Sequence, residues 1–248
     1  MGPNQNYRDG SLFALFRLKF QLSFVTPYSD LTDNMNILSF DQNCRRCKRL
    51  ASFLDSVRDE YPKYYARPVA PVGDTDPKLL IVGLAPGMHG ANATGRPFTG
   101  DFAGILLYKT LFEFGFSNQP NSTHLDDGLA LHDCRITNAV KCLPPQNKPL
   151  GDEIKMCNSY LEHEVKQLRE GTVILALGTV AHSAVLRATG LRAAAYPFAH
   201  GREHQLPRNL CLIDSYHYSR YNTQTRRLTE DMFREIFARI RQRLGTGR

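Results

Sequence analysis

Four short apolar runs along the chain predict β-strands, at residues 78–83, 135–140, 173–178 and 210–216. Each run is apolar almost throughout, which is typical of strands in a parallel sheet whose two faces are both covered. Stretches with a helical spacing of apolar residues separate the runs. This alternation predicts an α/β fold: a single three-layer domain with a short, mostly parallel four-stranded sheet flanked by helices.

Three helical patterns accompany these strands. Residues 102–114 are an apolar stretch after the first strand and its loop, and residues 229–244 are acidic at the start and arginine-rich at the end, as the helix dipole favours. Residues 152–170 carry one apolar stripe, with Asp152 as the expected N-cap and Gly171 as the expected stop. The stripe consists of Ile154, Cys157, Leu161, Val165 and Leu168.

The first 34 residues differ from the rest of the chain. Their apolar stretch, residues 11–25, is too short for a membrane span and is interrupted by Arg17 and Lys19. It also lacks the small-residue cleavage site of a secretory signal. We therefore expect residues 1–34 to be a poorly ordered extension before a domain of residues 35–248. The expected location is intracellular: the cytoplasm in a prokaryote, or the nucleus or mitochondrion in a eukaryote.

Composition narrows the class of partner without identifying it. The chain has 248 residues, enough for one sizeable core, and its hydrophobic fraction of 42% suits a globular protein. Its formal net charge of +7 at pH 7 is compatible with a polyanionic partner such as nucleic acid. Many basic proteins bind no nucleic acid, however, so the function has to be argued from the motifs.

A glycine-rich loop, GLAPGMHGANATGRPFTGD, connects the first strand to the first helix at residues 83–101. Such loops bring the backbone close to a ligand, often a phosphate at a helix N-terminus. Gly90 and Gly95 have the spacing of a P-loop, but Arg96-Pro97 replaces its Lys-Ser/Thr, and the fingerprint G-x-G-x-x-G is absent. Hydrolysis of a nucleotide triphosphate is therefore not indicated, and a different ligand is expected here.

Polar segments follow all four predicted strands, at residues 83–90, 141–149, 178–183 and 217–225. The carboxyl ends of parallel strands lie at one edge of the sheet, which is where open α/β sheets bind ligands. We therefore expect these four loops to form one active site.

The cysteines allow two interpretations. Cys44 and Cys47 form a C-x-x-C pair, Cys142 ends the second strand, and Cys157 lies on the apolar stripe of the following helix. Four thiolates could bind zinc or an iron–sulfur cluster. Alternatively, the last two are simply small buried hydrophobic residues. The spacing alone slightly favours the metal. The remaining two cysteines, at strand starts, are expected in the core: Cys134 and Cys211.

Three motifs and the four spaced cysteines together resemble the uracil-DNA glycosylase superfamily, in its type B branch (family 5). The motifs are GLAPGMHGANATGRPFTGD (83–101), ITNAVKCLPPQNKP (136–149) and SYHYSRYNTQTRRLT (215–229). The resemblance covers roughly residues 40–245, essentially the whole predicted domain. It implies a monofunctional DNA glycosylase that flips out and excises uracil, as well as hypoxanthine and other damaged bases, in base excision repair.

The resemblance also implies a cofactor and a partner. Families 4 and 5 hold a [4Fe–4S] cluster with four cysteines, which here are Cys44, Cys47, Cys142 and Cys157. The implied partner is DNA containing uracil or deaminated bases, double- or single-stranded, and we expect a monomer with no membrane partner. The rival interpretation is a DNA-binding module that has the same fold and cluster but little or no catalysis.

Each motif supplies side chains for the implied reaction. An excised base needs an aromatic platform, an amide that reads its edge, a donor to its developing anion and a group that stabilises the cationic sugar or positions water. The resemblance assigns base binding to Phe98, Asn138, Gly83 and Ala85, and catalysis to Asp101 and His217. An Asp before a helix also commonly serves as its N-cap, and this alternative remains open for Asp101.

Contacts to DNA phosphate are expected from the same loops, through the backbone amides of residues 87–92 and several side chains. The residues expected to contact the DNA backbone are Gly87, His89, Asn92, Arg96, Ser219 and Arg220. Two positions depart from the family pattern. Tyr218 replaces a proline, which removes a restraint on φ beside His217, and Ala93 replaces an arginine that is frequent in this branch.

Overall fold

The computed structural model of the protein describes residues 40–245, so the predicted extension at residues 1–34 lies outside the described residues. The strands are β1 (Val72–Gly73), β2 (Leu79–Gly83), β3 (Cys134–Asn138), β4 (Val173–Leu177), β5 (Glu203–Gln205) and β6 (Cys211–Ser215). They form one sheet in the order β1-β3-β2-β4-β6-β5. The four central strands are parallel, while β1 and β5 pair antiparallel at the two edges.

The prediction of four strands is wrong in number, although all four apolar runs form the parallel centre of the sheet. The two additional strands are short edge strands. β1 has two residues, and β5 has the sequence EHQ with only its central residue buried, so neither contains an apolar run. Short, polar edges of this kind also discourage pairing with other chains.

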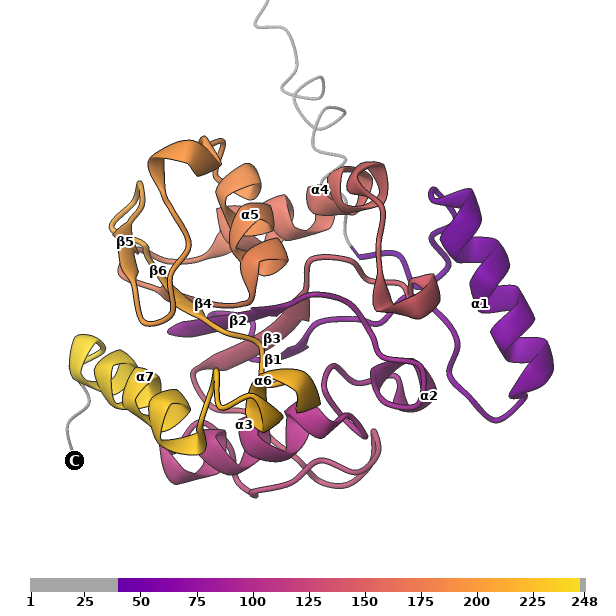
Figure 1. Ribbon diagram of the computed structural model, residues 1–248, viewed down its shortest axis with the longest axis horizontal. Coiled ribbons are helices and arrows are strands. Elements are labelled where there is room, and N and C mark those ends of the chain that lie inside the picture. The colour runs from indigo at the N-terminus through magenta and orange to yellow at the C-terminus, as the bar shows by residue number, and fades with distance from the viewer. Residues whose placement is uncertain (1–39, 246–248) are drawn as a thin grey trace, which may run out of the picture. The chain divides into compact units, whose positions relative to one another are not determined.

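Helices cover both faces of the sheet. The longer helices are α1 (Lys48–Glu60), α3 (Phe102–Glu113), α4 (Gly151–Gln167), α5 (Thr179–Ala188) and α7 (Glu230–Arg243). Alternate residues of β2 show the division: Leu79 and Ile81 pack with α3 and α7, whereas Leu80 and Val82 pack with α4 and α5. Figure 1 shows these two pairs of helices on opposite sides of the sheet. The three-layer architecture is therefore as predicted.

Three details of the predicted elements are wrong. α4 ends at Gln167, before the expected stop at Gly171. The N-cap of α4 is Leu150, whose backbone N–H donates to the Glu153 carboxylate at 2.7 Å, so Asp152 lies inside the first turn instead. The segment 178–183 is not an active-site loop, because α5 begins at Thr179. The buried face of α5 has helical spacing: Ala181, Ala184, Val185 and Ala188.

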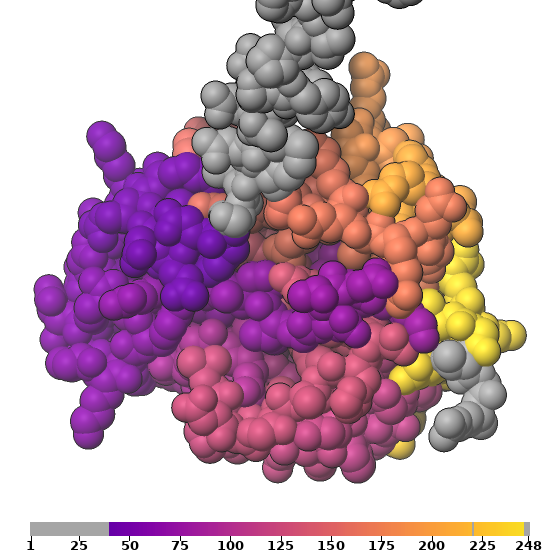
Figure 2. Space-filling model, turned by 180° about the vertical axis from the view of Figure 1, so that it is seen from behind, coloured from indigo at the N-terminus to yellow at the C-terminus, as the bar shows by residue number. Residues whose placement is uncertain are grey.

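A third core cluster lies beneath α1, a helix not predicted from the sequence. Its apolar face, which includes Leu50, Leu54 and Val57, packs against the segment after β3 and against Cys157 and Tyr160 of α4. The opposite views of Figures 1 and 2 place α1 and α7 at opposite ends of this domain. No helix in the described part of the chain is long and apolar enough to cross a membrane.

Candidate active site

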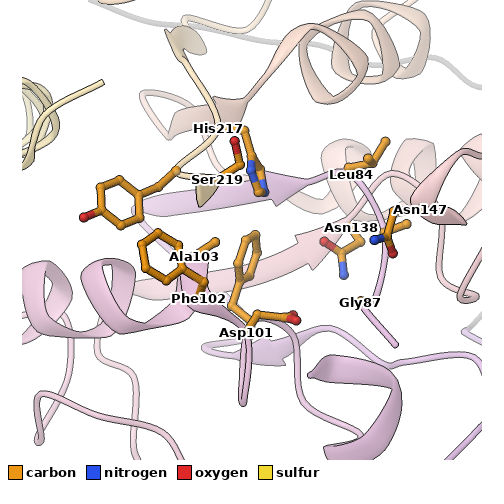
Figure 3. Close-up of a pocket in the computed structure, with 12 residues that line it drawn as sticks. Leu84, Gly87, Asp101, Phe102, Ala103, Asn138, Asn147, His217 and Ser219 are labelled. Carbon is orange, nitrogen blue, oxygen red and sulfur yellow. The ribbon is translucent and has the colours of Figure 1, made fainter. Parts of the chain in front are cut away.

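A pocket of about 380 Å³ lies at the carboxyl edge of the central strands. Its walls come from the loop after β2, the start of α3, the end of β3 and the loop after β6 (Figure 3). The expected site residues that line it are Ala85, Gly87, Phe98, Asp101, Asn138, His217 and Ser219. The structure thus brings together side chains from all three motifs.

Gly83 leaves space for the two side chains expected to bind the base. A Cβ atom at this position would overlap Asn138 Oδ1 and would lie 2.6 Å from Phe98 Cζ. Gly83 and Asn138 are the last residues of β2 and β3 and lie in register. The absence of a side chain therefore allows the amide and the aromatic ring to meet at the end of the sheet.

Asn138 is a buried amide at the pocket wall. It is 3% exposed, and among the described residues no hydrogen bond is formed by its side chain. Its amide atoms are not among the fully enclosed side-chain atoms that lack a hydrogen-bond partner, because the amide opens into the pocket. The amide is therefore available to a polar group inside the pocket.

His217 follows β6, and hydrogen bonds to its carbonyl oxygen fix its backbone. Ser219 N–H and Asn222 Nδ2 both donate to the His217 carbonyl oxygen, at 2.8 and 2.7 Å. The imidazole faces Phe98, with ring centroids 6.4 Å apart. Burial lowers the pKa of His217 below its usual 6.5, so the ring is neutral at pH 7 and keeps one N–H donor.

Asp101 occupies the N-cap position of α3, but its side chain makes no capping hydrogen bond to that helix. Instead, its Oδ2 accepts a hydrogen bond from Ala91 N–H at 3.3 Å, at the start of the short helix α2 (Ala91–Thr94). Burial raises the pKa of Asp101 above its usual 3.8, and the Ala91 hydrogen bond lowers it in part. The capping alternative is therefore not found for this carboxylate.

Two residues expected to contact phosphate are buried elsewhere. Asn92 is fully buried, and its Nδ2 donates to the Met88 carbonyl oxygen at 3.4 Å. Arg96 is 5% exposed and forms an ion pair with Asp127 at 2.7 Å, and it also donates to Ser122 Oγ at 2.8 Å. These positions contradict the expected phosphate contacts, because neither side chain reaches the surface.

The amides of residues 87–92 are also partly used within the loop. Gly90 N–H and Asn92 N–H donate to the Gly87 carbonyl oxygen, in addition to the Ala91 bond to Asp101. His89 is exposed, and its Nδ1 lies 2.9 Å from Tyr64 Oη. Ser219 caps the short helix α6 (Arg220–Gln224). The side chain of Arg220 lies outside what the structure describes.

Five lining residues were not expected from the sequence: Leu84, Phe102, Ala103, Asn147 and Tyr218. Asn147 offers a second amide. It lies two positions after the Pro144-Pro145 pair and has a φ of 57°. Asparagine tolerates this left-handed conformation better than most residues, so its position after two prolines was a usable signal.

The four cysteines of the expected cluster lie together beside α1. Cys44, Cys47, Cys142 and Cys157 line one small cavity, and Lys141 N–H donates to Cys157 Sγ at 3.3 Å. Burial raises the pKa of the thiols of the last three. The two cysteines expected in the core are fully buried there: Cys134 and Cys211.

A buried hydrogen-bonded group lies away from the pocket, behind the end of β6. Asp214 Oδ1 is 2.7 Å from His182 Nδ1, and Asp214 Oδ2 is 3.0 Å from His204 Nε2. The other His182 nitrogen lies 2.8 Å from the Tyr196 carbonyl oxygen. His182, a polar residue of segment 178–183, thus connects α5 to β6 and does not line the active-site pocket.

Comparison with known proteins assigns the family. Residues 70–241 match the sequence model of the family described as the uracil DNA glycosylase superfamily. The chain therefore belongs to this superfamily, as the motifs indicated. It is 45% identical over 209 residues to the type-5 uracil-DNA glycosylase of Thermus thermophilus, covering 82% of this chain and 94% of the relative.

Further relatives include a type-5 enzyme at higher identity and a type-4 enzyme at lower identity. The type-5 uracil-DNA glycosylase of Pyrobaculum aerophilum is 43% identical over 79% of this chain and 87% of its own length. The type-4 uracil-DNA glycosylase of Saccharolobus solfataricus is 26% identical over 82% of this chain and 85% of its own length. The resemblance to family 5 is therefore confirmed.

Proposed function

We propose that this protein excises uracil from DNA by hydrolysing the N-glycosidic bond, the first step of base excision repair. The observation that carries the proposal is the buried Asn138 amide, which has no partner among the described residues and lies beside Phe98 at the pocket. An amide offers a donor and an acceptor to the Watson–Crick edge of a flipped base, and an aromatic ring stacks on its face.

His217 and Asp101 supply the chemistry. Bond cleavage leaves negative charge on the departing base, and a neutral imidazole can donate a hydrogen bond to that anion without a buried positive charge of its own. The sugar becomes cationic, and the carboxylate of Asp101 stabilises it or orients the attacking water. Both side chains line the same pocket.

The size of the pocket supports larger substrates as well. Its volume of about 380 Å³ falls within the usual range for small-molecule sites, about 300–1,000 Å³. We therefore include hypoxanthine and other deaminated bases among the substrates. Exposed His89 and the pocket-lining Ser219 and Gly87 contact the DNA backbone in this proposal. The net charge of +7 makes DNA binding salt-dependent.

In this proposal the four grouped cysteines hold a [4Fe–4S] cluster, as the family resemblance implies. They line one cavity, and four thiolates are the ligand set of such a cluster, although four cysteines also bind zinc. Hydrolysis transfers no electrons, so the cluster's part is to join α1 to α4 and the segment after β3.

Two measurements test the cluster. The purified protein should be brown and contain iron and sulfide, and Cys157→Ser should lose the colour. Cys134→Ser, which changes a buried cysteine outside this group, should keep it. A colourless, zinc-loaded and active preparation would contradict the assignment.

The function is tested on a labelled oligonucleotide containing one uracil. After incubation, hot alkali breaks the strand wherever a base has been removed, and a hypoxanthine oligonucleotide is treated in parallel. Breaks at uracil support excision. Retarded bands without breaks would instead favour the DNA-binding module without catalysis.

A further inference from the structure

Tyr218 follows His217 directly, at the position where the resemblance described above leads us to expect a proline. Its ring stacks on the ring of Phe102, with centroids 5.4 Å apart and an angle of 4° between the ring planes. Both residues line the pocket. Phe102 is the first residue of α3 and follows Asp101, so this stack connects the two segments that carry the proposed catalytic side chains.

The other contacts of the loop around His217 connect it to elements other than α3. Before His217, Tyr216 N–H donates to His200 Nδ1 at 3.2 Å, and the two rings stack with centroids 5.1 Å apart. After it, Ser219 Oγ accepts a hydrogen bond from Asn222 N–H at 3.2 Å and caps α6. These contacts fix the loop to the segment before β5 and to α6, whereas the Tyr218 stack joins it to the start of α3.

We propose that Tyr218 is a positioning residue, whose stack on Phe102 sets the place of His217 relative to Asp101. The inference rests on the proposed function. A proline would restrain the loop by fixing its own φ, and tyrosine has no such restraint. Aromatic pairs prefer offset-stacked or edge-to-face arrangements, so the stack restrains the same loop through its contact with the start of α3.

The place of the stack fits this role. Figure 3 shows Phe102 on the other side of the pocket from Asn138 and Asn147. The stack of Tyr218 on Phe102 and the amide of Asn138 thus belong to different parts of the pocket lining. Movement of the Tyr218–Phe102 stack would shift His217, which precedes Tyr218, while leaving the amide of Asn138 in place.

A purely structural role for Tyr218 is the alternative, because its ring also approaches Phe233 of α7, with centroids 6.4 Å apart. The two roles differ in what a substitution changes. Loss of core packing lowers the melting temperature without slowing a folded enzyme. Loss of positioning slows the chemical step of a protein that remains folded.

The test measures single-turnover excision from a uracil oligonucleotide, together with binding of the same DNA and the melting temperature. Tyr218→Ala and Phe102→Ala should each slow excision by roughly ten- to a hundredfold, since small displacements of reacting groups have effects of that size. Tyr218→Phe keeps the stack and should match the wild type. The double alanine variant should be about as slow as either single variant, because both remove one contact.

Phe114→Ala is the matched control. Phe114 contacts Phe237 with centroids 5.8 Å apart and does not line the pocket, so its loss should lower the melting temperature and leave the excision rate unchanged. A Tyr218→Ala variant that melts earlier but excises at the wild-type rate would overturn the inference, as would fully multiplicative rate losses in the double variant. If the wild-type protein itself does not excise uracil, the proposed function is wrong, and the inference that rests on it is wrong as well.

Discussion

The carboxylate of Asp101 occupies the space that a side chain at Gly90 would need. A Cβ atom built on Gly90 overlaps both the carboxylate oxygen and carbon atoms of Asp101, and one built on Gly87 lies 2.5 Å from Asp101 Oδ1. The two glycines thus let the loop close around the carboxylate. This is the physical reason for a glycine-rich loop that carries no P-loop signature.

Gly90→Ala should therefore act on catalysis through Asp101. The added methyl group forces the carboxylate out of its place, and overpacking of this kind costs about 1–3 kcal/mol of stability. Excision should slow at least as much as in a variant that lacks the Asp101 charge. Gly151→Ala is the control, because a Cβ at the start of α4 meets nothing within 4 Å. Equal excision rates for both variants would contradict the relationship.

Asp101→Asn should slow excision without weakening the fold. The amide oxygen can still accept the hydrogen bond from Ala91 N–H, and the substitution removes a buried charge. We expect a loss of excision rate on the order of 10²-fold or more, the usual contribution of a positioned charged or basic group. The melting temperature should be equal or higher. An unchanged rate would leave His217 as the main catalytic side chain.

The dependence on pH follows from the opposite shifts of the two groups. Excision needs Asp101 ionised and His217 neutral, so the rate should fall on the acid side, where the raised pKa of Asp101 and the lowered pKa of His217 both lie. Near pH 7 the rate should be level. In Asp101→Asn the residual rate should show only the acid fall that belongs to His217. In that variant, a loss of rate already centred at pH 6.5 would contradict the lowered pKa of His217.

Stability should shift with pH in the corresponding sense. Asp101 has a raised pKa in the folded state, so its favourable contribution is present below about 3.8 and is lost as the pH rises through the folded value. His217 has a lowered pKa, so its contribution is present above about 6.5 and is lost as the pH falls through the folded value. Unfolding of wild type and Asp101→Asn between pH 3 and pH 8 measures the first difference.

The sequence predicted what depends on local pattern. Buried parallel strands need continuous apolar runs, so β2, β3, β4 and β6 were visible, and the polar residues after three of them do reach one pocket. Edge strands need no such run, which is why β5 was missed. Segment 178–183 was wrongly predicted to be an active-site loop because the buried partner of its His182, Asp214, is 32 positions further along the chain.

Arg96 illustrates the same limit. The sequence around an arginine in a glycine-rich loop does not show whether its side chain faces a phosphate or a buried carboxylate. The partner of Arg96, Asp127, is 31 positions away. Removing one member of such a buried ion pair typically costs about 3–5 kcal/mol.

Arg96→Ala should therefore destabilise the fold by about that amount, about 3–5 kcal/mol, measured by urea unfolding. The salt dependence of DNA binding should not change, because its slope reports phosphate contacts that Arg96 does not make. Binding is measured at a temperature where the variant is folded. A stable variant with a shallower salt slope would restore Arg96 as a phosphate contact.

Phe98 and Asn138 should be separable by substrate. Phe98→Ala removes a stacking surface worth on the order of 1–3 kcal/mol per base, and every base has such a face, so uracil and hypoxanthine excision should fall by similar factors. Asn138→Ala removes hydrogen bonds to one base edge, at a cost on the order of 1–3 kcal/mol, and its effect should differ between the two bases. The measurement is the single-turnover rate of each variant on both oligonucleotides. Since Gly83 brings both side chains to one point, Phe98→Ala with undiminished rates on both substrates would place the base elsewhere than this pocket.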